Sequence, residues 1–246
     1  EKKVSDRTQE LAENNEKLVR TVEKNKNLVR ILVHDLNNSL TVIKMSVGIL
    51  TDPSDRHSQE KKKKSLSRIQ RALNNQEEII DHVRNMEAME SGKLSLQLQP
   101  VSLSEIMENA RFIFKERLEA KKLTLNYEEP GQEELYILAD AVTVSNNVFN
   151  NLISNAIKFS FPEGRIDIRI EQRSDTKICI IIRDYGMGMP SEILENLFSF
   201  QKQTSRKGTG NESGTGFGMP LVKTYMDQYG GAIDIRTFEK ETQGEP

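Results

Sequence analysis

A segment of polar and apolar residues, NNLISNAIKFS at 150–160, carries side chains that could bind a nucleotide. Its apolar residues recur at helical spacing, which predicts a helix with one buried face. That spacing places Asn151, Asn155 and Lys158 together on the opposite face. Two amides and an ammonium on one stripe suit phosphate oxygens and a hydrated cation such as Mg²⁺, which prefers substrate phosphates to many protein ligands.

Two glycine-rich segments follow. Asp184 ends the apolar run IIIRD and precedes Gly186 and Gly188 in DYGMGMP. A carboxylate beside flexible backbone can accept a hydrogen bond from an exocyclic amine, and adenine has one. This segment therefore predicts a contact with the base.

The third segment, GTGFGMP at 214–220, precedes an apolar helical run. Glycines before a helix let backbone N–H groups converge on an anion. In this order, the three segments resemble the N box and the two glycine boxes of the sensor histidine kinases. The ATP-binding fold of that family is shared with gyrase, Hsp90 and MutL proteins.

The remaining signature of the family is found upstream. HDLNNSL at 34–40 is similar to the phospho-acceptor box, and the resemblance extends from about residue 25 to 237. The heptad pattern places His34 at the outermost position of a helix, where packing does not require a histidine. A neutral imidazole can act as a nucleophile, and Asp35 can orient the ring and stabilise the developing imidazolium. Asn38 lies one turn further along the same face.

The resemblance implies a role for each residue of the nucleotide site, with ATP and Mg²⁺ as cofactors. Asn155 would coordinate Mg²⁺, Asn151 and Lys158 would contact phosphates, and Phe159 would line the site. Asp184 would accept from the adenine amine, beside Gly186 and Gly188, which allow close approach. The hinge and phosphate cradle would consist of Gly214, Thr215, Gly216 and Gly218.

The implied function is ATP-dependent autophosphorylation on His34 and phosphotransfer to an aspartate of a response-regulator receiver domain. In this family a Thr or Asn at the place of Asn38 is associated with dephosphorylation of the partner. Two alternatives stay open: an ATPase-type conformational switch, and a nucleotide-binding interaction module without histidine phosphotransfer. The ATPase relatives activate water with a glutamate where this chain has Asn151, which cannot serve as a general base.

Two features depart from the family pattern. Ser39 stands where the commonest form has a proline, so we expect the helix to run straight through the site. The final segment 239–246 shows no apolar alternation, although family members usually add one more strand there. We therefore expect the sheet to lack that edge strand, or the true end of the protein to have been cut away.

Residues 1–52 are predicted to form one long helix, because apolar residues recur every seven positions from Val4 onward. A turn at Pro53 separates it from a second helix over 57–91. Each helix carries one apolar stripe, and two helices cannot bury both stripes well alone. Dimerisation into an antiparallel four-helix bundle resolves this and makes the chain a homodimer.

The second half mixes strands and helices. We expect strands at 123–128, 135–139, 165–171, 177–184 and 232–237. Helices are expected at 102–122, where S-x-x-E forms a capping box, and at 141–160, 191–200 and 217–229. A mobile loop resembling the ATP lid should occupy 201–213.

The predicted fold class is therefore α+β, with a dimeric antiparallel four-helix bundle and an N-terminal coiled coil, followed by an α/β sandwich that binds ATP. The expected domains are a coiled-coil signalling helix at 1–30, the dimerisation and phospho-acceptor hairpin at 31–92, a linker at 93–100 and the catalytic domain at 101–246.

Composition restricts the partners and the compartment. The 246 residues carry a net charge of −2, which predicts no attraction to nucleic acid or to a membrane surface. No apolar run approaches the roughly 20 residues of a spanning helix. The chain begins without Met and within a helical pattern, so we expect the cytoplasmic part of a longer sensor protein.

Overall fold

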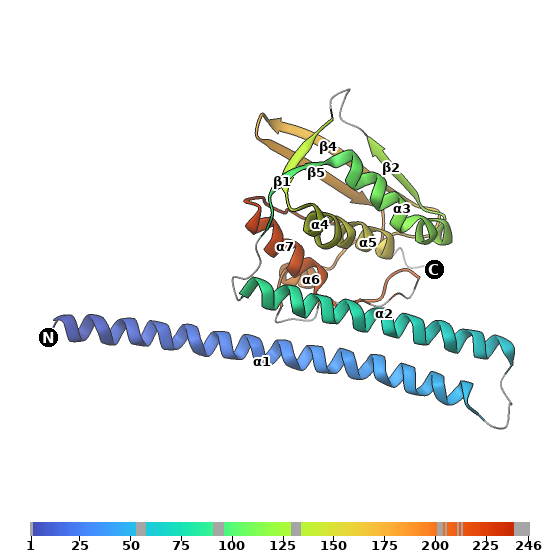
Figure 1. Ribbon diagram of the computed structural model, residues 1–246, viewed down its shortest axis with the longest axis horizontal. Coiled ribbons are helices and arrows are strands. Elements are labelled where there is room, and N and C mark those ends of the chain that lie inside the picture. Colours follow the sequence, from blue (N-terminus) through green and yellow to red (C-terminus); the bar gives the residue numbers. More distant parts are fainter. Residues whose placement is uncertain are drawn as a thin grey trace, which may run out of the picture. The chain divides into compact units, whose positions relative to one another are not determined.

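The computed structural model describes residues 2–52, 58–90, 96–128, 134–200, 204, 206–210, 212 and 214–238. They form two compact units. The first contains α1 (Lys2–Leu50) and α2 (Gln59–Glu90) as far as Asp81, and the second contains the remaining elements. Within the first unit the two helices run antiparallel (Figure 1).

The long helix α1 is continuous through His34, as the sequence predicted. Ser39 retains the backbone N–H that a proline would remove, so the helical hydrogen bonds need no break there. Its side chain is buried and accepts a hydrogen bond from Nδ2 of Asn75 on α2, at 3.0 Å. The residue that replaces proline thus joins the two helices.

Small residues are buried in the helix pair, whereas much of the predicted apolar stripe is exposed. Ser46 and Ser65 are each 2% exposed. Large apolar side chains of both helices are 41–58% exposed in the single chain: Leu40, Val47, Leu66, Leu73 and Ile80. Burying such a stripe requires a partner surface.

The second unit contains two sheets. In the smaller, β1 (Gln99–Ser102) pairs antiparallel with β3 (Tyr136–Ala139). In the larger, the strand order is β2-β4-β5: β2 (Thr124–Glu128) lies parallel to β4 (Arg165–Ser174), which pairs antiparallel with β5 (Lys177–Asp184). These strands confirm the α+β assignment.

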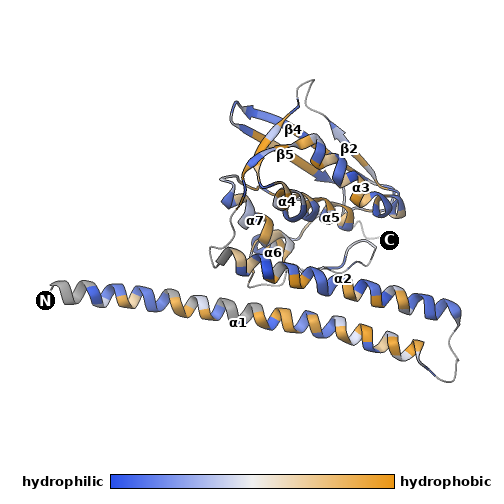
Figure 2. Ribbon diagram, viewed as in Figure 1, coloured by the Kyte–Doolittle hydropathy of each residue, from blue (hydrophilic) through white to orange (hydrophobic). Residues whose placement is uncertain are grey.

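Helices cover one face of the larger sheet. Along β4, Ile166, Ile168 and Ile170 are buried while the alternate residues are not, as expected for a strand with one covered face. The helices of this unit are α3 (Leu103–Lys121), α4 (Ala141–Thr143), α5 (Asn150–Phe159), α6 (Ser191–Asn196) and α7 (Gly218–Gln228), of which α3 contacts β2 and α5 contacts β5. Figure 2 shows hydrophobic residues on the strands and on the helices beneath them.

Helix α3 begins as its sequence predicts. The hydroxyl of Ser102 accepts a hydrogen bond from the backbone N–H of Glu105 at 3.2 Å, which satisfies one of the free donors of the first turn. The helix ends at Lys121, after which Lys122 adopts a left-handed conformation with φ of 53°. The side chain of Lys121, the last residue of α3, reaches the end of α5.

The predicted helix over 141–160 contains a π-helical segment, η1 (Val144–Phe149), between α4 and α5. The N–H of Asn150 bonds to the carbonyl of Ser145, five residues earlier. One widened turn allows Val148, Phe149 and Ile153 to be buried together. Such segments are often found beside functional sites, and here it directly precedes the N box.

The strand predicted over 232–237 is not formed. Residues 231–238 form neither helix nor strand, although the half-buried Ile233, Ile235 and Thr237 alternate with exposed neighbours. A strand requires a ladder of backbone hydrogen bonds, and none of the described strands pairs with this segment. Its tie to the domain is instead a hydrogen bond from the Met189 N–H to Thr237 Oγ1, at 2.7 Å. The final segment, 239–246, lies outside the described residues.

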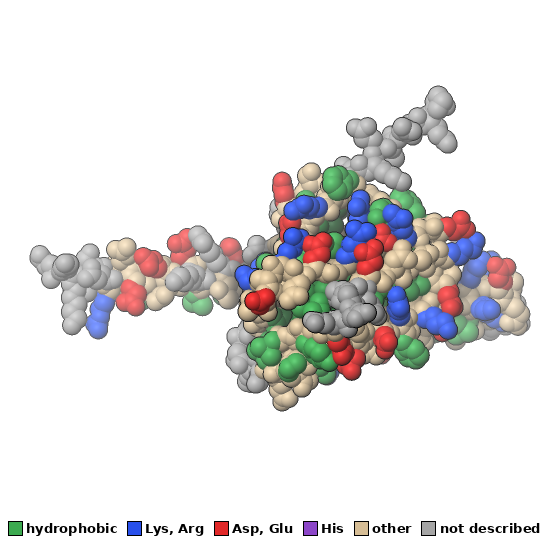
Figure 3. All heavy atoms as spheres, turned by 90° about the horizontal axis from the view of Figure 1, so that it is seen from above, with side chains coloured by type: hydrophobic (Ala, Val, Ile, Leu, Met, Phe, Trp, Pro, Cys, Tyr) green, Lys and Arg blue, Asp and Glu red, His purple; other side chains and the backbone are tan. Residues whose placement is uncertain are grey.

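Charges of both signs are mixed on the face that Figure 3 shows. Cross-strand ion pairs such as Arg169–Glu128, at 3.1 Å, illustrate this arrangement. Within the described part of the chain, no helix has an apolar stretch long enough to cross a membrane.

Candidate functional site

The end of α5 meets the first glycine segment through the backbone of Phe159. A Cβ atom on Gly186 would lie 2.0 Å from the carbonyl oxygen of Phe159, which leaves no space for a side chain. The N–H of Met187 donates to that oxygen at 3.2 Å. Gly188 has a φ of 66°, which favours glycine. Glycine at 186 therefore allows the N-box helix and the DYGMG turn to touch.

Asp184 stands at the end of β5 and is exposed. Its Oδ1 accepts a hydrogen bond from the Gly186 N–H at 3.0 Å, which fixes the direction of the carboxylate. Among the described residues no other hydrogen bond or ion pair involves this side chain, so Oδ2 can accept from a ligand amine. The carboxylate is held in place before any ligand binds.

The polar face of α5 lies against the third segment. The ammonium of Lys158 would lie 2.5 Å from a Cβ atom on Gly214, and Oδ1 of Asn151 would lie 2.5 Å from one on Gly218. Lys158 is only 7% exposed. Gly218 is the first residue of α7. The N-terminus of α7, the ammonium of Lys158 and the amide of Asn151 therefore form one polar surface.

Backbone conformation shapes the loop before α7. Gly216 has a φ of 79°, in the left-handed region. Thr215 is buried, and its Oγ1 accepts a hydrogen bond from the Phe217 N–H at 3.4 Å. No acidic residue occupies the first turn of α7. The loop and helix start thus present N–H donors and positive charge, a combination that suits phosphate.

Asn155 lies one turn after Asn151 on α5 and is half-buried. Within the described part of the chain, no group of three His, Cys, Asp or Glu side chains could hold a metal ion. A cation here would depend on an amide oxygen and on ligand phosphates. Mg²⁺ accepts such a donor set, because it retains water and binds substrate phosphates with few protein ligands.

Arg206 is a residue of this site that the sequence analysis missed. Its guanidinium lies 4.7 Å from the ring centroid of Phe159 and donates to the carbonyl of Gly188. The ammonium of Lys158 lies 4.8 Å from the same ring. Arg206 belongs to the predicted lid loop, whose composition gave no sign of where its charges would lie. Part of that loop is therefore anchored, whereas residues 201–203, 205, 211 and 213 lie outside the described residues.

A second polar centre is found in the first unit, around His34. Its side chain is 63% exposed, whereas that of Asp35 is 11% exposed. Nδ1 of His34 lies 3.1 Å from Oδ1 of Asp35 and 3.3 Å from Nδ2 of Asn38. A single ring nitrogen cannot donate to Asp35 and accept from Asn38 at once, so the two contacts belong to different tautomers. The tautomer that donates to Asp35 leaves Nε2 unprotonated.

The structure therefore gathers the predicted residues into two groups. His34, Asp35 and Asn38 cluster on α1. The N-box residues and the two glycine segments contact one another in the second unit through the pairs Phe159–Gly186, Lys158–Gly214 and Asn151–Gly218.

Two family models match the chain in succession. Residues 24–92 match the His Kinase A (phospho-acceptor) domain. Residues 141–245 match the histidine kinase-, DNA gyrase B- and HSP90-like ATPase family. The first match contains the His34 cluster and the second contains the three segments predicted to bind a nucleotide, in the order that the motifs predicted.

Two curated relatives support the same assignment. The chain is 30% identical over 178 residues to the signal transduction histidine-protein kinase BarA of Escherichia coli, which covers 70% of this chain and 19% of BarA. It is 28% identical over 164 residues to the autoinducer 2 sensor kinase/phosphatase LuxQ of Vibrio parahaemolyticus, and the match covers 65% of this chain and 19% of LuxQ. The chain thus spans about a fifth of the length of these relatives.

Three solved structures share the fold at low identity. Histidine kinase AdeS of Acinetobacter baumannii has a TM-score of 0.58 at 19% identity, covering 79% of this chain and 86% of that one. Full-length ShkA in complex with AMPPNP has a TM-score of 0.54 at 16% identity, and the match covers 84% of this chain and 42% of ShkA. Histidine kinase ThkA in complex with the response regulator TrrA has a TM-score of 0.51 at 22% identity, and the match covers 74% of this chain and 55% of that one. With its phospho-acceptor and ATPase-type segments in order, the chain contains a sensor histidine kinase catalytic core.

Proposed function

We propose that this chain transfers the γ-phosphate of ATP to Nε2 of His34. The observation that carries the proposal is the pairing of an exposed imidazole with a nearly buried carboxylate, at 3.1 Å between Nδ1 and Asp35 Oδ1. This contact favours the tautomer in which Nε2 holds a lone pair toward solvent. Asp35 thus serves as the residue that orients the nucleophile and stabilises its positive charge.

The transfer requires no proton to leave Nε2. Its lone pair forms the bond to the γ-phosphorus, the bond from that phosphorus to the β,γ-bridging oxygen breaks, and ADP leaves with the electron pair. The positive charge that develops on the ring is shared with Asp35 through the Nδ1 proton. Phosphohistidine then donates its phosphoryl group to an aspartate of a response-regulator receiver domain. ThkA, which shares the fold, has been solved with a response regulator.

The nucleotide would bind where the three motifs meet. Oδ2 of Asp184 would accept from the adenine amine, and Gly186 and Gly188 would allow the base to approach the backbone. Lys158 and Asn151 would contact the phosphates. Gly214, Thr215, Gly216 and Gly218 would supply the N–H cradle before α7. Phe159, whose ring is close to the cations of Lys158 and Arg206, would form part of the wall.

Mg²⁺ would be held by Asn155 together with the phosphates, and it would neutralise the charge that develops on them. Asn151 provides no general base for water. Its Nδ2 donates to the Asn147 carbonyl at 2.8 Å, and its amide is neutral. Slow hydrolysis follows, which leaves the γ-phosphate available to His34 and disfavours the ATPase-type switch.

A homodimer would bury the exposed apolar stripe of α1 and α2 in a four-helix bundle. Further up α1, Leu11, Leu18, Val22 and Val29 are 56–69% exposed, as expected for a coiled-coil seam that lacks its partner. Light scattering of the full chain should give twice the chain mass, and a monomer at micromolar concentration would contradict the bundle. The substrate ATP and the receiver-domain partner are cytoplasmic, so we place this chain in the cytoplasm as part of a longer sensor.

The nucleotide-binding proposal is tested with a titration of Mg-ATP. Asp184→Ala should weaken binding by about tenfold or more, because a hydrogen bond to a charged group contributes about 1.5–3 kcal/mol. Adenine specificity should fall as well, so that GTP and ATP compete more equally. Unchanged affinity and specificity in this variant would place the base elsewhere. Absence of ATP binding to the wild type would contradict the nucleotide-binding proposal itself.

A further inference from the structure

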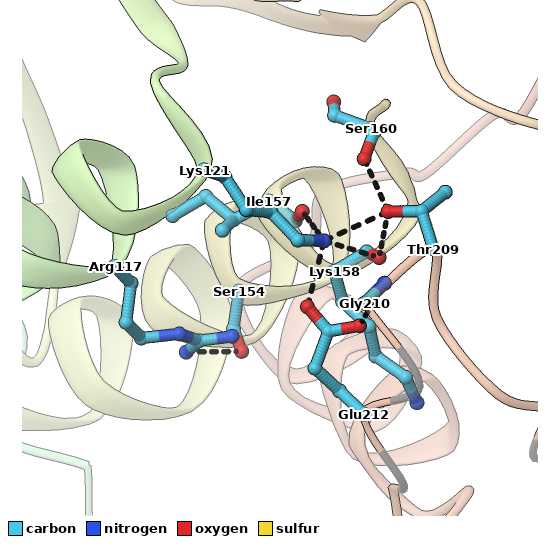
Figure 4. Close-up of polar contacts among 9 residues, drawn as sticks. All are labelled: Arg117, Lys121, Ser154, Ile157, Lys158, Ser160, Thr209, Gly210 and Glu212. Atoms are coloured by element: carbon cyan, nitrogen blue, oxygen red, sulfur yellow. Dashed lines mark hydrogen bonds and ion pairs between the residues drawn. The ribbon is translucent and has the colours of Figure 1, made fainter. Parts of the chain in front are cut away.

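The ammonium of Lys121 joins three segments that lie far apart in the sequence (Figure 4). It is the last residue of α3, and its side chain is 12% exposed. Nζ donates to the carbonyl oxygens of Ile157 and Lys158, both at 2.9 Å, and to Oγ1 of Thr209 at 2.8 Å. It also lies 2.6 Å from Oε1 of Glu212. No motif in the sequence indicated a role for Lys121.

The Lys121 contacts at α5 satisfy carbonyl groups that the helix cannot satisfy itself. The last carbonyls of a helix lack partners within it and carry a partial negative charge, so a cation there stabilises the helix end. Lys158, which belongs to that last turn, therefore has its backbone fixed from the side of α3.

The lid segment, defined here as Gly208–Gly210 with Glu212, is folded onto the same helix end. The Thr209 N–H donates to the Lys158 carbonyl at 3.1 Å. The Gly208 N–H donates to the Glu212 carbonyl at 2.9 Å, and the Gly210 N–H donates to Oε2 of Glu212 at 2.8 Å. The lid segment is thus a closed turn whose acidic side chain faces Lys121.

The carboxylate of Glu212, which pairs with Lys121, is ionised at neutral pH. Burial acts to raise the pKa of Glu212, but the hydrogen bonds from Lys121 and from backbone N–H groups, including that of Gly210, hold this pKa below its ordinary value. A carboxylate with a lowered pKa keeps its charge near pH 7.

The lid segment also contacts the side chain of Lys158. A Cβ atom on Gly208 would lie 2.6 Å from Cγ of Lys158, and one on Gly214 would lie 2.5 Å from its Nζ. The Lys158 side chain therefore runs between the lid segment and the loop before α7. Displacement of the lid segment would remove the contacts on one side of the Lys158 side chain.

We propose that Lys121 is a positioning residue for the nucleotide site, which anchors the lid segment to the end of α5 and thereby fixes Lys158 beside Gly214. The inference rests on the proposed function for its consequence, because Lys158 is the residue assigned to the phosphates. The anchor itself consists of contacts within the protein and is tested without nucleotide.

The first experiment measures trypsin cleavage of the full chain after Arg206 and Lys207, in the absence of nucleotide, with the cut sites identified by mass spectrometry. Native-state cleavage follows the population of the locally open form. Lys121→Gln should accelerate it about tenfold. Lys121→Arg, which keeps the charge, should stay within a few-fold of wild type. Lys122→Gln is the matched control, because the exposed Lys122–Glu163 pair, at 2.7 Å, lies next along the chain; it should cleave at the wild-type rate.

Glu212→Gln provides a second route to the same answer if Lys121→Gln lowers the stability of the whole domain. It should also accelerate cleavage, and the double variant should cleave no faster than Lys121→Gln alone, since both changes break one contact. Equal cleavage in wild type, Lys121→Gln and Glu212→Gln would overturn the anchor.

The second experiment titrates Mg-ATP into the same variants. Lys121→Gln should weaken binding at least fivefold, whereas Lys122→Gln should not change it. Faster cleavage with unchanged affinity would overturn the positioning role. If the wild type itself does not bind ATP, the proposed function fails, while the cleavage result still decides whether the anchor exists.

Discussion

Nδ1 of His34 lies 3.1 Å from Oδ1 of Asp35, with the histidine side chain 63% exposed and the aspartate side chain 11% exposed. Among the residues that the structure describes, the polar contacts of this exposed ring are all made by Nδ1, which leaves Nε2 available. In the proposed reaction, Asp35 therefore determines which ring nitrogen is the nucleophile, and no distant base is needed.

Replacing Asp35 by Asn should reduce the rate of autophosphorylation about 100-fold, in the range that positioned acid–base groups contribute. The amide can donate to Nδ1 and so favours the tautomer whose Nε2 is protonated. The measurement is the initial rate of label incorporation from γ-labelled ATP at saturating nucleotide. Mg-ATP affinity is the control, and it should not change. A rate within threefold of wild type would exclude the orienting role.

Asn38→Ala should keep autophosphorylation within a few-fold of wild type. Nδ2 of Asn38 can donate to Nδ1 only in the tautomer whose Nε2 is protonated, so its loss removes no interaction that the proposed reaction at Nε2 requires. The same variant should slow dephosphorylation of the phosphorylated partner at least tenfold, a barrier change of about 1.4 kcal/mol. An amide at this place can hold a water in line with a docked phospho-aspartate.

The dephosphorylation assay follows loss of phosphate from the partner with and without the kinase, and the partner's own hydrolysis is subtracted. Equal kinase-dependent rates in wild type and Asn38→Ala would make Asn38 an ordinary exposed helix residue.

Gly186→Ala should destabilise the second unit by about 3 kcal/mol, because its Cβ would overlap a backbone carbonyl at the end of α5. Backbone cannot rotate away as a side chain can. Gly48→Ala is the control: it lies within α1, no atom lies within 4 Å of its Cβ position, and a stability gain of about 0.5–1 kcal/mol is expected. Urea unfolding followed by circular dichroism measures both. A Gly186→Ala variant as stable as wild type would mean that α5 and the DYGMG turn do not touch.

The sequence predicted those parts of the fold that depend on the local backbone conformation of each residue. The glycines of the two boxes, the cap at Ser102 and the helical spacing around Asn155 all determine local geometry, and each element formed close to its expected range. The exposure of His34 followed from heptad position alone.

Features that depend on distant contacts were not predictable. The π-helical turn at 144–149 results from a shift of one hydrogen bond, which leaves the apolar pattern unchanged. Lys121 and Arg206 reach their positions only because α3 ends beside α5 and the lid loop folds back. The strand expected at 232–237 had the alternation of a strand but no partner among the described strands. Alternation shows which faces a segment would bury, whereas pairing depends on the neighbour.

The most direct test of the account uses the full chain incubated with ATP labelled in the γ-phosphate and Mg²⁺. We predict protein-bound label that is stable to base and lost in acid, as expected of a phosphoramidate. Label should be absent from His34→Gln, which should nevertheless bind Mg-ATP as tightly as wild type. Label that persists in His34→Gln, or that resists acid, would contradict phosphotransfer to His34.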